Sequence, residues 1–200
     1  MSNTRSIGFS YHMGWTCCAI VDVNKAGLRR VATGRLDTGD EADRESWEPY
    51  HVAGGWRGLE RVPVSDNPAT IVNRGMRAQR RHTRKNLEIF LQDITVYRAG
   101  ILVGRGSKAA TIEQAINSHP QIHMAESHAV CDAIVAALES RSIAVHRIDR
   151  KTMFAQTASE LGFEKENIMQ LLASITPAQG PWRQEEKYCA IAAWLAVARH

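Results

Sequence analysis

The sequence predicts an α/β protein with a mixed sheet, in which an antiparallel β-meander is followed by alternating helices and strands. Three observations predict this class. The first part of the chain has three strand-like runs separated by short turns that contain Gly and Asn. After residue 67, amphipathic stretches alternate with short apolar runs. The last stretch is apolar on all sides over 188–198, which predicts a buried helix.

The predicted meander has strands at 6–10, 15–23 and 28–36. In the second strand, the adjacent Cys17 and Cys18 are predicted to point to opposite faces. The four cysteines of the chain include no C-x-x-C spacing, so a zinc or redox motif is not indicated. We expect them to be buried, reduced thiols.

Residues 37–68 are polar, rich in Gly, Pro and Trp, and have no clean period. This composition predicts a long loop or an insertion within a single domain that spans 1–200. Tyr50 and His51 of this segment are interpreted as exposed aromatic side chains. Two roles stay open for them, stacking on nucleic-acid bases or pinning the segment onto the core.

A basic helix is predicted over 68–94, with Asn67 as its N-cap and Pro68 at its first position. It has six basic residues, Arg74, Arg77, Arg80, Arg81, Arg84 and Lys85. Four of the arginines recur at steps of three, four and three, so they lie along one helical face. Because like charges repel unless an anion neutralises them, this pattern favours contact with nucleic-acid phosphates over a solvated face, which usually mixes charges of both signs.

The second half of the chain alternates between helices and strands. Strands are predicted at 95–106 and 143–149, and a short strand or loop at 120–126. Helices are predicted at the remaining segments, 107–119, 127–142, 151–162, 164–175 and 183–200.

This element order is that of the RNase H-like fold, and three stretches resemble its RuvC-type branch, the Holliday-junction resolvases and their relatives. Residues 6–21, SIGFSYHMGWTCCAIV, resemble the opening strand, a Gly-containing turn and the second strand. Residues 122–149 are similar to the central acidic strand with the helix and strand that follow. Residues 185–200, EEKYCAIAAWLAVARH, resemble the final helix, which begins with acidic residues.

The resemblance implies a two-metal nuclease site, in which carboxylates of the first strand, the central strand and the last helix hold Mg²⁺ or Mn²⁺. The matching positions here are Ser10, Glu126, and Glu185 or Glu186. Ser10 stands where the family has aspartate, and a neutral hydroxyl is a weaker metal ligand than a carboxylate. His12 would be the nearest replacement ligand. The pattern around Ser10 therefore favours the fold of the family, and the missing aspartate disfavours its metal-dependent cleavage reaction.

Each of these carboxylates also has a structural interpretation. Glu126 lies in a stretch with three histidines, His119, His123 and His128. Their spacing matches no zinc or iron motif, so a carboxylate–histidine metal site competes with a simpler role, in which Glu126 favours the N-terminus of a helix that begins at Ser127. Glu185 and Glu186 open the last helix, where acidic residues stabilise the helix dipole without any further function.

The sequence therefore predicts a nucleic-acid-binding RNase H/RuvC-like protein with an altered or degenerate two-metal nuclease site. The net charge of +4 and the pI near 9.0 favour polyanionic partners mildly. We expect a cytoplasmic protein, because no apolar stretch is long enough to span a bilayer and the N-terminus lacks a signal-peptide core. Two alternatives stay open: a non-catalytic protein-interaction scaffold of the same fold, working as a homodimer, and an active Mg- or Mn-dependent nuclease that uses His12.

Overall fold

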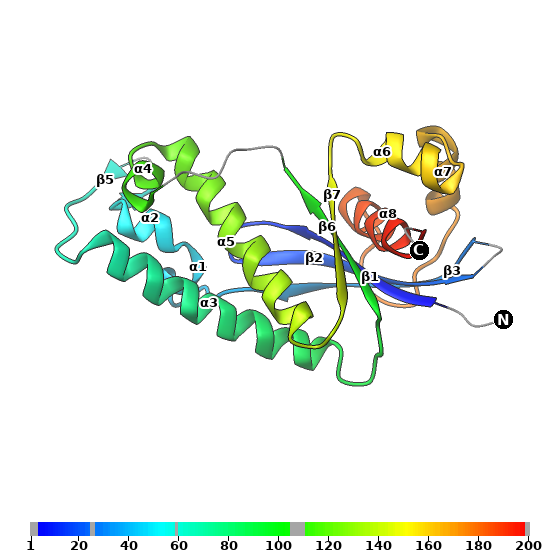
Figure 1. Ribbon diagram of the computed structural model, residues 1–200, viewed down its shortest axis with the longest axis horizontal. Coiled ribbons are helices and arrows are strands. Elements are labelled where there is room, and N and C mark those ends of the chain that lie inside the picture. The colour runs from blue at the N-terminus through cyan, green and yellow to red at the C-terminus, as the bar shows by residue number, and fades with distance from the viewer. Residues whose placement is uncertain (1–3, 25–26, 59, 105–110, 199–200) are drawn as a thin grey trace.

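The computed structural model describes residues 4–24, 27–58, 60–104 and 111–198 (Figure 1). Its strands are β1 (Thr4–Tyr11), β2 (Trp15–Asn24), β3 (Gly27–Asp37), β4 (Trp56–Arg57), β5 (Glu60–Arg61), β6 (Arg98–Val103) and β7 (Ala144–Asp149). The helices are α1 (Arg44–Trp47), α2 (Pro49–Ala53), α3 (Pro68–Phe90), α4 (Ile112–Ile116), α5 (His119–Glu139), α6 (Met153–Gln156), the π-helix η1 (Thr157–Leu161), α7 (Lys165–Ala173) and α8 (Gln184–Ala198). Parts of the strand predicted at 95–106 and of the helix predicted at 107–119 lie outside the described residues.

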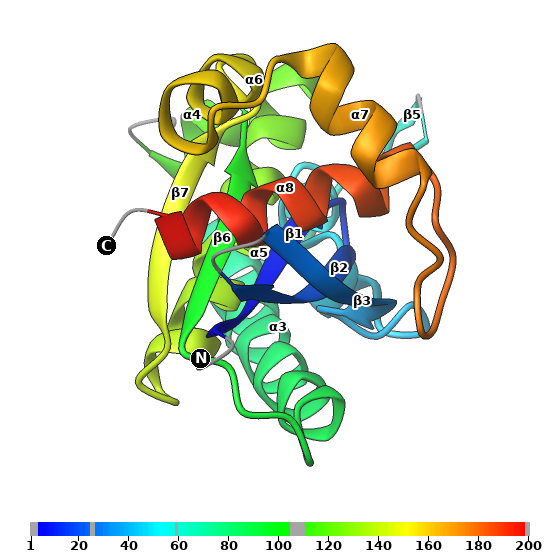
Figure 2. The ribbon, with the colours of Figure 1, turned by 90° about the vertical axis from the view of Figure 1, so that its right-hand side faces the viewer.

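Five strands form one mixed sheet in the order β3-β2-β1-β6-β7. The first three strands pair antiparallel, whereas β6 pairs parallel with β1 and β7 pairs parallel with β6. The predicted meander and the mixed α/β class are therefore confirmed. Helices α3 and α5 cover one face of the sheet, and α8 with α6 and α7 covers the other (Figures 1 and 2).

Strand alternation divides the core into two layers. Ile7 and Phe9 of β1 pack in the cluster with α3 and α5, so Ser6, Gly8 and Ser10 face α8. The same alternation puts Cys18 in the first cluster and Cys17 in the second, as predicted. All four cysteines are buried and free.

Helix α8 approaches β1 closely because β1 has small side chains on that face. A Cβ atom built on Gly8 would lie 1.8 Å from the carbonyl oxygen of Cys189. Ser6 Oγ donates a 2.7 Å hydrogen bond to the carbonyl of Ala193. Four helical residues rise about 6 Å and two strand residues about 6.6 Å, so each step of two along β1 matches a step of four back along α8. The next match pairs Ser10 with the start of α8.

Residues 37–68 form structure where the sequence predicted a long loop or insertion. Helices α1 and α2 and the small hairpin β4–β5 lie at one end of the molecule, beside α4 and the ends of α3 and α5 (Figure 1). A third hydrophobic cluster joins Tyr50 to Ile71 and Ile122. Tyr50 and His51 are only 8% and 5% exposed, so interpreting them as exposed aromatics was wrong. The segment folds because its apolar side chains face α3 and α5.

Helix α3 begins as predicted, with Pro68 in its first turn and Asn67 as its N-cap. The Asn67 side-chain oxygen accepts hydrogen bonds from the amides of Ala69 and Thr70, at 2.9 and 3.3 Å. The helix ends at Phe90, four residues before the predicted end, with Leu91 as the C-cap.

We expect Asn67→Ala to destabilise the protein by about 1 kcal/mol, because two amides at the N-terminus of α3 lose their acceptor. Urea denaturation followed by circular dichroism would measure this loss. Asn67→Asp keeps an acceptor at the same place, so its midpoint should stay near that of the wild type. Equal midpoints for the alanine variant and the wild type would contradict the capping role.

Helix α5 begins at His119, eight residues before the predicted start, so the expectation of a short strand or loop at 120–126 was wrong. Pro120 lies in the first turn, where a missing N–H breaks no helical hydrogen bond. Glu126 consequently lies inside a helix and not on the central strand of the sheet. The parallel neighbour of β1 is β6, which has no acidic residue.

Candidate functional site

Ser10 and Glu185 meet where the C-terminal end of β1 lies against the start of α8. Ser10 Oγ donates a 2.5 Å hydrogen bond to Glu185 Oε1. Arg150 follows β7, and its Nη1 atom lies 3.3 Å from Ser10 Oγ and 3.4 Å from Glu185 Oε1. The Arg150 guanidinium also lies over the Tyr188 ring, 5.5 Å from its centroid. Sequence analysis missed Arg150, because no motif marks it and only the sheet order brings the end of β7 to this place.

His12 belongs to the same cluster. Its Nε2 atom lies 3.3 Å from Glu185 Oε1, an ion-pair distance without hydrogen-bond geometry. The ring stacks on Trp15 with centroids 4.1 Å apart. Burial raises the pKa of Glu185, but the hydrogen bond from Ser10 and the charges of His12 and Arg150 outweigh it, and the net shift is downward. Glu185 is therefore an ionised carboxylate surrounded by donors.

Glu186 is adjacent in sequence but makes other contacts. Its Oε2 atom accepts a 2.8 Å hydrogen bond from the amide of Arg183, the residue before α8. This is the return half of a capping box. Its Oε1 atom accepts from Cys17 Sγ at 3.2 Å. These contacts agree with the structural interpretation, in which Glu186 stabilises the start of the last helix.

Glu126 makes its contacts in the helical end of the molecule. It is 1% exposed, and its Oε1 atom accepts from the amides of Tyr50 and His51 at 2.7 and 3.1 Å. These amides belong to the first turn of α2, whose N-cap residue Glu48 makes no side-chain cap. Glu126 therefore caps a helix, as its structural interpretation supposed, but it caps α2 and not its own helix. Burial raises the pKa of Glu126, against the lowering effect of these hydrogen bonds.

The residues around Ser10 do not fit the two-metal site that the resemblance implies. Across the sheet, Ser10 is in register with Cys17, Leu102 and Ile148, and none of these residues is a carboxylate. Arg150 supplies a positive charge where the site would need carboxylate oxygens around a cation. Of the predicted ligands, the structure brings Ser10, His12 and Glu185 together, and it places Glu126 elsewhere.

A cavity of about 300 Å³ opens beside this cluster. Its polar lining residues come from β1, α5 and the end of β7, and they are Ser10, Tyr11, His123, Ser127, His128 and Arg150. Basic and hydroxyl side chains predominate among them, so the cavity is suited to an anionic or polar group.

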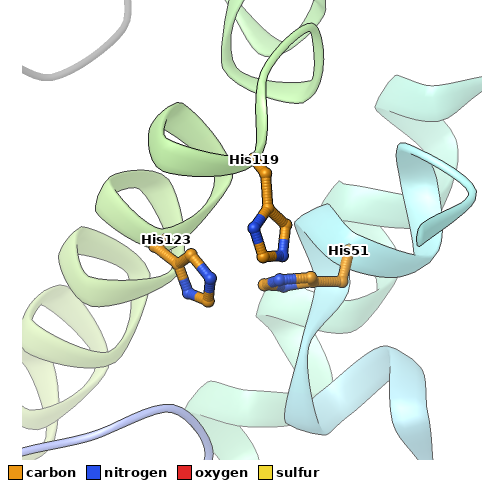
Figure 3. Close-up of side chains that lie close together, drawn as sticks. All are labelled: His51, His119 and His123. Atoms are coloured by element: carbon orange, nitrogen blue, oxygen red, sulfur yellow. The ribbon is translucent and has the colours of Figure 1, made fainter. Parts of the chain in front are cut away.

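Three histidines gather at the helical end of the molecule, His51 from α2 and His119 and His123 from α5 (Figure 3). One ring nitrogen of each lies within 4.8 Å of the others. His51 Nδ1 also lies 3.3 Å from Glu126 Oε1. Burial and the neighbouring His51 and His119 lower the pKa of His123. The sequence indicated two of these histidines but grouped them with His128, and His51 was missed because it is 68 residues away from His119.

The six basic residues of α3 are all exposed, and two of them have acidic partners. Arg74 donates two 2.5 Å hydrogen bonds to Glu45 of α1, and Arg84 pairs with Glu88 at 3.2 Å. The hydrogen bonds from Arg74 lower the pKa of Glu45. In the described part of the chain, no ion pair engages the other four residues, Arg77, Arg80, Arg81 and Lys85.

Comparisons with known proteins support the fold. No family model matches the sequence, and a search of curated proteins found no match. The chain is similar to the Thermus thermophilus RuvC structure, with 8% identity over 96% of this chain and 92% of that one and a TM-score of 0.52. It is also similar to T. thermophilus RuvC in complex with Holliday junction substrate, with 8% identity over 98% and 93% and a TM-score of 0.53.

Among the described residues, no helix is both long and apolar enough to cross a membrane. At 8% identity the likeness concerns the fold alone. The chain therefore has a RuvC-like mixed α/β fold of the RNase H-like type.

Proposed function

We propose that this protein binds nucleic acid through the outer face of α3, and that its Ser10 cluster does not perform two-metal phosphodiester cleavage. The observation that supports binding is the set of four exposed cations without acidic partners in the described chain, Arg77, Arg80, Arg81 and Lys85. They follow one another at steps of three, one and four, which places them on one side of the helix. An approaching phosphate backbone would neutralise them and release its counterions.

Two arginines of α3, Arg74 and Arg84, are left out of the proposed binding face because acidic residues balance their charges. Arg74 is held by Glu45 and by Asp66, at 3.6 Å from the latter, so its charge is largely balanced. Arg84 shares its charge with Glu88. The proposed face therefore extends from Arg77 to Lys85, a rise of about 12 Å along the helix, which spans a few phosphates of one strand.

The composition of the Ser10 cluster supports the proposed absence of cleavage. Hydrolysis with two metals needs several carboxylate oxygens to hold the metal ions beside the reacting phosphate. Here Glu185 is bound by Ser10 and by Arg150, and Glu186 is engaged in capping. A guanidinium beside the cavity is suited to holding a phosphate in place, so we assign Arg150 a binding role.

Fluorescence anisotropy with labelled single-stranded, duplex and four-way-junction DNA and with RNA tests the proposal. Replacing Arg77, Arg80, Arg81 and Lys85 with glutamine should weaken binding to every ligand. For duplex DNA it should reduce the magnitude of the slope of log K against log salt by about 3.6. A matched control replaces four exposed basic residues outside α3, Arg29, Arg57, Arg141 and Lys165, so that the net charge is the same. The control should lose much less affinity.

Three outcomes would overturn the proposal. Undetectable binding at low salt, together with a tight dimer in light scattering, would favour the protein-interaction scaffold. Equal losses in the two four-residue variants would show that α3 is not the binding face. Cleavage of any ligand with Mg²⁺ or Mn²⁺ that disappears in Glu185→Gln would favour the active nuclease.

A further inference from the structure

The geometry points to a second site, built from residues outside the Ser10 cluster: we propose that His51, His119 and His123 bind a divalent transition-metal ion of the zinc class. Figure 3 shows the three rings directed toward a common space between α2 and α5. Each residue offers one ring nitrogen, and these atoms all lie within 4.8 Å of one another. The ring centroids are 4.4–5.4 Å apart, in edge-to-face arrangements.

The chemistry of the donors selects the ion. Imidazole nitrogen suits Zn²⁺ and its neighbours in the first transition row, whereas Mg²⁺ and Ca²⁺ prefer oxygen. A tetrahedral zinc ion with Zn–N bonds of about 2.05 Å needs nitrogens about 3.3 Å apart. We infer that side-chain rotation supplies this closure, because His119 and His123 are one helical turn apart on α5 and neither is buried.

Glu126 orients His51, the buried histidine of the proposed metal site. Its Oε1 atom already accepts two backbone amide hydrogen bonds, so it is the acceptor for His51 and the Nδ1 atom of that ring is the donor. This tautomer leaves the lone pair of His51 on Nε2, where a metal would bind. A carboxylate behind a metal-bound histidine is the usual support of such sites. The Oε2 atom of Glu126 is buried and has no hydrogen-bond partner in the described chain, so the contact with His51 is made by Oε1.

The position of the site determines what the metal would do. It would tie α2, from the segment 37–68, to the first two turns of α5. His123 also lines the 300 Å³ cavity, so one side of the ion would face that space. Three protein ligands leave the fourth tetrahedral position of zinc open, and the cavity would supply a water or a polar ligand there.

Isothermal titration of the untagged, EDTA-treated full chain with Zn²⁺ tests the site. We expect one Zn²⁺ per chain, undiminished by millimolar Mg²⁺, and a higher Tm for the loaded protein. Replacing Zn²⁺ with Co²⁺ should give the visible d–d absorption of a tetrahedral site. His119→Ala and His123→Ala should each weaken Zn²⁺ binding more than tenfold, and Glu126→Gln should weaken it by about tenfold or more. His128→Ala, on the same helix but outside the cluster, should bind like the wild type.

His119 is partly exposed and His123 is exposed, so their variants are expected to fold, and circular dichroism would confirm it. The proposal is wrong if the wild type gives no Zn²⁺ binding heat, or if binding survives unchanged in both His119→Ala and His123→Ala. Loss of binding in His128→Ala alone would assign the metal to a different set of ligands. Nucleic-acid affinity is measured separately in EDTA, so failure of this site leaves the role of α3 intact.

Discussion

Gly8→Ala is expected to destabilise the protein by about 3 kcal/mol. The added methyl group would lie 1.8 Å from the carbonyl oxygen of Cys189 and 2.8 Å from the amide nitrogen of Ala193. Both atoms belong to the backbone of the buried helix α8, so no flexible side chain can move aside. Relief requires α8 to shift away from β1, which opens the layer that α8 shares with the sheet. Urea denaturation followed by circular dichroism and by tryptophan fluorescence would measure the loss.

Gly104→Ala is the matched control, because a Cβ atom on Gly104 would meet no atom of the described residues within 4 Å. Its unfolding free energy should stay within about 0.5 kcal/mol of the wild type. A Gly8→Ala protein with an unchanged midpoint and slope would mean that α8 does not pack this closely on β1. The contact between Ser10 and Glu185 would then lose its structural basis, since it depends on the same register.

The fold could be predicted largely because its signals are local. Strand-like runs separated by short turns with Gly and Asn indicated the meander, and Asn67 with Pro68 indicated the start of α3. The uniformly apolar last helix indicated burial, and α8 does lie in the core from Cys189 to Ala196. The exceptions are segments stabilised by distant residues. Helices α1 and α2 are short, and the cap of α2 comes from Glu126, 76 residues after Tyr50.

The candidate sites were harder to predict because they combine residues from separate elements. Ser10, His12 and Glu185 were all identified as candidates, and they do lie together. Arg150 could not be identified, because a lone arginine after a strand has no distinctive pattern. Glu126 was assigned to the sheet by its likeness to an acidic strand, but Pro120 starts a helix there and turns Glu126 toward α2. The sequence around Glu126 thus resembles the acidic strand of the family, but Glu126 lies in a helix and not in the sheet.

The environment of Ser10 gives its substitution a physical meaning. Ser10 is 1% exposed and lies on the face of β1 that packs against α8, where Ser6 and Gly8 are also small. A carboxylate there would lie beside ionised Glu185, and two adjacent negative charges need a cation between them. The hydroxyl instead donates to Glu185, and Arg150 supplies the positive charge. Arg150 therefore balances the charge of Glu185, the role that a metal cation would have beside two carboxylates.

Glu126→Leu is expected to destabilise the protein by about 3 kcal/mol, because it leaves three buried donors without their acceptor. These donors are the amides of Tyr50 and His51 and the Nδ1 atom of His51. The loss should concentrate in α2, so hydrogen exchange at the Tyr50 and His51 amides should accelerate more than exchange in β1. The measurement belongs in EDTA, where no metal contributes to stability.

Glu126→Gln separates hydrogen bonding from charge. Its amide oxygen can still accept from both amides, so we expect it to lose about 1 kcal/mol and to keep slow exchange at Tyr50 and His51. If the leucine variant were as stable as the glutamine variant, hydrophobic burial would compensate for the lost acceptor, and Glu126 would not be needed to hold α2. If instead only the leucine variant loses the protection of these amides, the buried carboxylate is the link that fixes α2, and with it His51, against α5.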